Sequence, residues 1–146
     1  MGSWHPQITH FPIALIISAF FFQIVAMLKS SWVCRSTPLW ILGFAIVPAL
    51  FSLLSGEQAA HLASTTRSLE DSAQALLARH DAFATFTVWM SLAVLVSWVW
   101  FFLKYPGDRR VDTAALFFLF LLALAVAATG YLGGELVLTY GVGVKM

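Results

Sequence analysis

Four long runs of apolar residues, each without a charged residue, divide the sequence. They cover residues 11–28, 38–54, 82–103 and 113–132. Each run is close to the ~20 residues that an α-helix needs to cross the hydrocarbon core of a bilayer. Because a chain inside lipid must satisfy its own backbone hydrogen bonds, the runs predict helices rather than isolated strands. The pattern therefore predicts an all-α, four-helix membrane bundle that forms a single domain over residues 1–146.

The segment between the second and third runs has a different pattern. Apolar positions and one histidine recur there at helical spacing: Leu69, Ala73, Leu76, Leu77 and His80. This spacing predicts a short amphipathic helix over residues 67–81, with His80 on its apolar stripe and Arg79 and Asp81 facing elsewhere. The preceding residues, GEQAAHLA, continue the second helix beyond the bilayer and place Glu57 and His61 on one face.

Composition excludes several classes of protein. Sixty per cent of the residues are apolar and only 10% are charged, whereas soluble domains have about 25% charged residues. An ordinary soluble enzyme is therefore excluded. The net charge of +1 and the lack of a basic stripe predict no nucleic-acid partner. The single cysteine, Cys34, leaves no disulfide framework and no cysteine-based zinc site.

The basic residues predict how the helices are oriented in the membrane. Five of them follow the first or third run or precede the fourth, in short connections: Lys29, Arg35, Lys104, Arg109 and Arg110. The side that holds both termini has three: Arg67, Arg79 and Lys145. Since short cytoplasmic loops are enriched in lysine and arginine, we expect both termini to lie on the periplasmic or extracellular side.

All four histidines fall on the side of the termini. They are His5, His10, His61 and His80. His10 opens the first run and His80 immediately precedes the third. A histidine on a buried face needs a partner for each ring nitrogen, which is a hydrogen-bonding group, a metal ion or a haem iron.

The end of the fourth run adds small residues and an acid on the same side. Gly130 and Gly134 form a small-xxx-small pair, Gly133 adds a third small position, and Glu135 follows. Such a surface permits close approach of a neighbouring helix or of a flat cofactor. An acid at this depth is costly unless it is paired or ligates a metal.

Three functions fit these residues. A b-type haem needs two imidazoles from different helices, and His10 and His80 meet this requirement, with His61 and His5 as substitutes or a second pair. The chain would then be an electron-transfer subunit without catalysis of its own, serving a c-type cytochrome or a quinol. Alternatively, a zinc, copper or iron ion takes nitrogen and oxygen ligands from His10, Glu57, His61, His80 and Glu135. The third possibility is an accessory subunit without cofactor, packed against other membrane subunits or its own copies.

Four segments of the sequence resemble one family over nearly the whole chain. They are HPQITHFPIAL at 5–15, SGEQAAHLA at 55–63, ARHDAFA at 78–84 and GYLGGELVLTYGVGV at 130–144. They are similar to the DUF2231 family of predicted bacterial membrane proteins. The resemblance implies four helices with histidines near one membrane face, in a bacterial membrane. Together with the basic residues, it predicts a bacterial inner membrane with periplasmic termini.

The resemblance also bears on the site. Some family members are joined to c-type cytochrome domains, which implies an electron-transfer setting. Carried over by position, the motif histidines are His5, His10 and His80, accompanied by Glu57 and Glu135. Tyr140 departs from the family, because many members have a histidine at that position before the GVGV tail.

Overall fold

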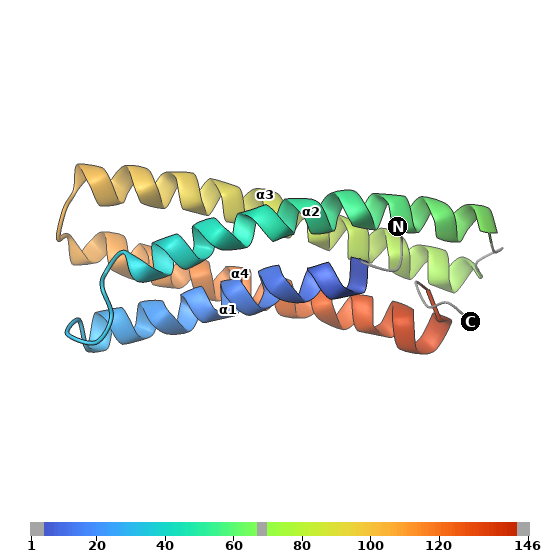
Figure 1. Cartoon of the computed structure of the whole chain (residues 1–146), viewed down its shortest axis with the longest axis horizontal. Helices are drawn as coiled ribbons and strands as arrows, with labels where there is room; N and C mark the ends of the chain where they lie inside the picture. Colours follow the sequence, from blue (N-terminus) through green and yellow to red (C-terminus); the bar gives the residue numbers. More distant parts are fainter. Residues whose placement is uncertain (1–4, 67–69, 143–146) are drawn as a thin grey trace.

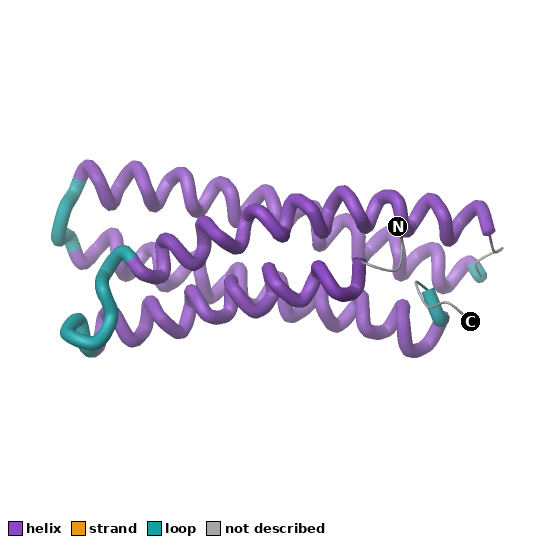
Figure 2. The backbone as a smooth tube through the Cα atoms, in the orientation of Figure 1, coloured by secondary structure: helices purple, strands orange, loops and turns teal. Residues whose placement is uncertain are grey.

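Four long helices make up the computed structural model of the chain (Figure 1). The structure describes the backbone of residues 5–66 and 70–142, and the side chains of residues 7–58 and 70–142. The helices are α1 (His5–Leu28), α2 (Thr37–Thr66), α3 (Asp71–Lys104) and α4 (Arg109–Tyr140). Within these residues there is no strand, and short connections join the helices (Figure 2).

All four helices are long and apolar enough to cross a membrane. The candidate spans are Gln7–Leu28, Thr37–Gln58, Asp71–Lys104 and Arg109–Tyr140. The predicted fold class, an all-α membrane bundle of four helices, is confirmed. Figure 1 shows both termini at one end of the bundle, which we call the terminal end. We call the opposite end, with the 29–36 and 105–108 connections, the loop end.

The helices are arranged as a ring. Helix α1 packs on α2 and α4, and α3 packs on the same two helices. Among the described residues, α1 and α3 face each other diagonally without backbone contact. A ligand held between α1 and α3 would therefore cross the interior of the ring.

Small and branched apolar side chains fill most of the interior together with Trp98, while many of the large aromatic side chains face outward. Ala19, Leu42, Ala45 and Leu119 are completely buried. The exposed aromatics include Phe21, Phe44, Phe51, Phe86, Trp89 and Phe117. Because lipid tails solvate such side chains, this distribution is that of a membrane bundle rather than of a soluble one.

The predicted amphipathic segment is part of a longer helix. Helix α3 begins at Asp71 and runs without interruption for 34 residues, about 51 Å at 1.5 Å per residue. Residues 71–81 are thus its first turns and not a separate helix. No proline or glycine interrupts residues 71–104, and a break would leave backbone groups without hydrogen bonds near the membrane. Leu69 and the rest of residues 67–69 lie outside the described residues.

The amphipathic pattern itself is confirmed where the side chains are described. Ala73 is buried, Leu76, Leu77 and His80 are half-buried, and Arg79 and Asp81 are exposed. Helix α2 likewise continues through Thr66, as the sequence GEQAAHLA predicts. The extended α2 and α3 carry the bundle past the predicted spans at the terminal end.

Candidate functional site

His80 lies on the inner face of α3. Ala73, Thr87 and Val94, at intervals of seven residues from it, are all buried. Two turns of a helix take about seven residues, so these side chains share one face. His80 continues this inward face toward the terminal end, where its side chain is half-buried.

One hydrogen bond determines which ring nitrogen of the neutral imidazole carries the hydrogen. Nδ1 of His80 lies 3.1 Å from the carbonyl oxygen of Thr129 on α4. A carbonyl oxygen only accepts, so Nδ1 carries the hydrogen in the neutral ring. Nε2 then carries the lone pair, and no described residue bonds to it. This arrangement, with Nδ1–H on a backbone carbonyl and Nε2 left over, is the one that metal-ligating histidines use.

Gly133 makes room for the imidazole. A Cβ atom at position 133 would lie 3.0 Å from Cε1 of His80 and 3.4 Å from its Nδ1. The sequence left open whether the glycines serve helix packing or a cofactor. At Gly133 the neighbour is a histidine ring of the same chain, which contacts the backbone of α4 directly.

The other two glycines have different surroundings. A Cβ atom at Gly130 would lie 3.6 Å from Cδ1 of Ile13, an ordinary contact with α1. At Gly134 nothing lies within 4 Å of such an atom. Gly133 is therefore the glycine of the three whose lack of a side chain makes room for His80.

His10 lies at a similar depth but on a different face. His10 lies one turn before Ile13 on α1, and Gly133 lies about one turn after Gly130 on α4. Because Ile13 is near Gly130 and the two helices are antiparallel, His10 lies level with the contact between Gly133 and His80. The side chain of His10 is exposed, whereas Pro12 and Ile16 of the same helix are buried. The two histidines predicted as a pair therefore share a level but differ in burial.

The remaining predicted residues are distributed around the same end. Glu57 is exposed and Glu135 is half-buried. His5 and His61 belong to α1 and α2, and their side chains lie outside the described ones. Among the side chains of residues 7–58 and 70–142, no three histidine, cysteine or acidic groups lie close enough to share a metal ion.

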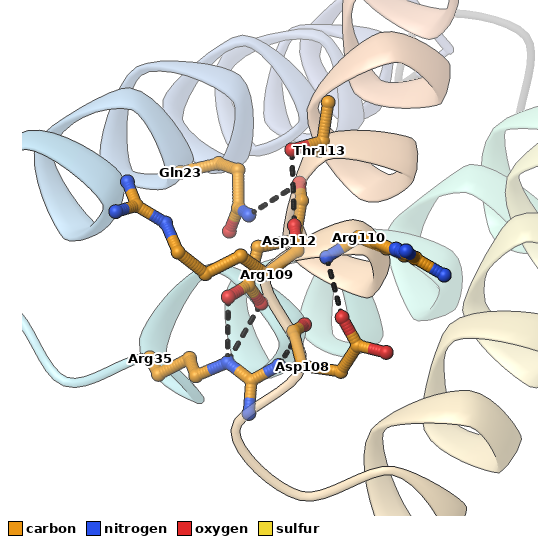
Figure 3. A network of polar contacts seen from close by, with 7 residues as sticks. All are labelled: Gln23, Arg35, Asp108, Arg109, Arg110, Asp112 and Thr113. Atoms are coloured by element: carbon orange, nitrogen blue, oxygen red, sulfur yellow. Dashed lines mark hydrogen bonds and ion pairs between the residues drawn. The ribbon is translucent and has the colours of Figure 1, made fainter.

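The loop end has a polar cluster that sequence reasoning missed (Figure 3). Nε of Arg35 donates to both carboxylate oxygens of Asp112, at 2.7 and 2.8 Å, and Nη2 donates to the carbonyl of Asp108 at 2.8 Å. Nε2 of the buried Gln23 donates to the carbonyl of Asp112 at 3.0 Å. We call Gln23, Arg35, Asp108 and Asp112 the loop-end clamp, since they join α1 and the 29–36 connection to α4.

A signal for the clamp was present in the sequence. Asp112 is an acid one residue before a long apolar run, and Arg35 lies two helices earlier on the same predicted side. An acid at the edge of a span calls for a partner. Arg35 was used only to predict the orientation of the helices, so its pairing with Asp112 was not predicted.

Comparison with known proteins gives one match. A family model described as "Predicted membrane protein (DUF2231)" matches residues 3–146. Neither the curated proteins nor the solved structures contain a match to the chain.

Proposed function

Starting from the DUF2231 family of predicted membrane proteins, to which this chain belongs, we propose that it is a b-type haem subunit for electron transfer. In this proposal Nε2 of His80 would ligate the haem iron. The observation that carries the proposal is the hydrogen bond from Nδ1 of His80 to the carbonyl of Thr129, because it leaves the ligating nitrogen with its lone pair.

The surroundings of His80 support a flat cofactor. The imidazole rests on Gly133, which has no side chain to occupy the surface of α4 at this contact. A bound haem supplies one-electron redox chemistry, with a potential set by its axial ligands and by burial. The chain's own part is to orient the imidazole through Thr129 and to exclude water with the apolar ring of helices.

The second ligand comes from the remaining histidines. His10 is the first choice because it lies level with His80 on another helix. His61 and His5 are the substitutes. In this proposal the redox partner is a c-type cytochrome or a quinol, reached at the terminal end, and further membrane subunits or copies of the chain complete the assembly.

The test is a reduced-minus-oxidised visible spectrum with a pyridine haemochrome assay on protein from cells that supply haem. We expect a sharp α-band and at least one haem b per chain. His80→Ala removes the band, and free imidazole added to His80→Gly restores it. His10→Ala, His61→Ala and His5→Ala, measured singly, identify the second ligand.

Asp81→Ala is the matched control, because Asp81 is exposed and adjacent to His80. It should keep the full haem complement. A colourless wild type contradicts the proposal, and so does a His80→Ala variant that keeps its haem. Stoichiometric zinc, copper or iron without porphyrin in elemental analysis would replace it with a metal-binding function.

We propose that the protein lies in a bacterial inner membrane with the terminal end in the periplasm. The exposed Cys34 belongs to the loop end and serves as the probe. A membrane-impermeant maleimide should label it in inverted vesicles but not in intact spheroplasts. A Cys34→Ser, Asp71→Cys variant, with the probe at the other end, should give the reverse result, and the same pattern for both proteins contradicts this orientation.

A further inference from the structure

An apolar groove lies between α3 and α4 at the loop end, away from the histidines. Its volume is about 460 Å³. We call it the α3–α4 groove, and its walls include Met90, Val94, Phe101, Val111, Ala115 and Phe118. These residues belong to membrane spans, so the groove lies in the hydrocarbon region and takes an apolar occupant.

The length of the groove matches one leaflet of a bilayer. On α3 its lining runs from Met90 to Tyr105, a rise of about 22 Å at 1.5 Å per residue. One leaflet is half of a ~30 Å hydrocarbon core, about 15 Å, and its headgroup region adds several ångströms. A partner helix that crossed the membrane would need a groove about twice as long, so the dimensions favour a lipid.

The mouth of the groove carries positive charge. Arg110 and Asp108 line it, and Lys104 and Arg109 are their neighbours in sequence. These four residues sum to +2, from three cations and one acid. Oδ1 of Asp108 accepts from the backbone N–H of Arg110 at 2.8 Å. The other nearby acid, Asp112, is already paired with Arg35.

A second, shallower furrow follows the outer face of α4. Its volume is about 610 Å³, and it is lined by Arg109, Arg110, Thr113, Ala114, Phe117 and Phe118. It shares Arg110, Ala114 and Phe118 with the α3–α4 groove. The three shared residues are spaced four apart along α4 and form a ridge between the groove and the furrow. We call the groove and the furrow the two apolar tracks, and both begin at an arginine. Figure 3 shows Arg109 and Arg110 extending to opposite sides of α4. Arg109 lines only the furrow, whereas Arg110 lines both the furrow and the α3–α4 groove.

We propose that this surface binds one anionic phospholipid with two acyl chains. One chain lies in the α3–α4 groove and the other in the furrow, on either side of the Ala114–Phe118 ridge. Arg110, which lines both tracks, holds the phosphate, and Arg109 beside the furrow adds positive charge near the headgroup. A zwitterionic lipid offers the same chains but a neutral headgroup, so the arginines select the anionic one.

Native mass spectrometry of the intact chain in detergent, titrated with phosphatidylglycerol or phosphatidylcholine, tests the proposal. We expect one phosphatidylglycerol per chain, bound several-fold more tightly than phosphatidylcholine. Arg110→Gln should weaken the binding of phosphatidylglycerol by about fivefold, the effect of one basic residue at a membrane surface. It should weaken the binding of phosphatidylcholine by less, because the choline group offsets the charge of the phosphate. Ala114 lies on the exposed ridge, so Ala114→Trp should weaken the binding of both lipids by obstructing the two tracks.

Lys29→Gln is the matched control, since it removes one positive charge at the loop end outside both tracks. It should leave phosphatidylglycerol binding intact. Equal affinity for the two lipids overturns the proposal, as does an equal loss in Lys29→Gln and Arg110→Gln. Recovery of a quinone in place of a phospholipid from the purified chain also overturns it, because a quinone has no anionic group for the arginines.

Discussion

The two ends of the bundle handle polar groups in opposite ways. At the loop end, Arg35 bonds both carboxylate oxygens of Asp112 and a backbone carbonyl, so its charge is matched inside the protein. At the terminal end, His80 uses one ring nitrogen for Thr129, and no described residue bonds to the other. The polar side chains of the clamp are therefore matched within the protein, whereas one ring nitrogen of His80 has no bond from the described residues.

The glycines at the two ends of the bundle also have different roles. At the loop end, Gly107 has a φ of 83°, so its backbone makes the turn into α4 that other residues adopt only with strain. At the terminal end, Gly133 lies within a helix and provides space for a side chain. A glycine in a helix interior costs about 1 kcal/mol of stability relative to alanine. Stability is thus lower where the imidazole needs room.

Breaking the clamp should have the largest effect on stability. Asp112→Ala leaves the partly buried guanidinium of Arg35 without its carboxylate, and loss of one partner from such a pair costs about 3 kcal/mol. We expect this loss in unfolding by SDS titration in micelles. Asp71→Ala is the control: Asp71 is exposed in the first turn of α3, and its removal should cost no more than about 1 kcal/mol.

A double variant sharpens this prediction. Arg35→Met combined with Asp112→Leu removes both charges, and replacing a buried ion pair by apolar side chains is often close to neutral. The double variant should therefore be more stable than Asp112→Ala alone. If it is equally destabilised, the pair is not the origin of the effect.

Adjacent glycines give the next largest effect, at the other end. Gly133→Ala places a Cβ atom 3.0 Å from the ring of His80, whereas Gly134→Ala meets nothing within 4 Å. Gly134→Ala should gain helix stability, and Gly133→Ala should be about 1–2 kcal/mol less stable than it. The same SDS titration measures both. Equal stabilities would show that the imidazole moves aside without cost.

The smallest effect should come from Gln23. Its Nε2 donates to the carbonyl of Asp112, but its buried Oε1 has no partner among the described residues. Gln23→Met gives up one hydrogen bond and also removes an unpaired buried oxygen, and these contributions nearly cancel. We expect a change in unfolding free energy within about 0.5 kcal/mol. A loss above 2 kcal/mol would assign Gln23 to the clamp as a principal member.

The sequence predicted the fold well because hydrophobic length is a strong local signal. Residues 113–132 contain no charge, and lipid permits only a helix there. The union of residues 71–81 with the third span was not predicted. Its amphipathic pattern differs from the uniformly apolar run that follows, although the backbone has no reason to stop between them.

The inward position of His80 was predictable, but its contacts were not. His80 on an apolar stripe followed from local periodicity. Its bond to Thr129 and its packing on Gly133 join residues about 50 positions apart, and no local pattern specifies which helices become neighbours. The exposure of His10 depends likewise on which face of α1 packs against α2 and α4.

The separation of Arg35 and Asp112 along the chain, 77 residues, also sets an order of events during biosynthesis. Arg35 leaves the ribosome with the first two helices, but its acid arrives only with the fourth. Because chains are made from the N-terminus onward, the first hairpin must wait in the membrane with an uncompensated guanidinium. The guanidinium is compensated only when the last helix has been inserted, so formation of the ion pair follows insertion of all four helices.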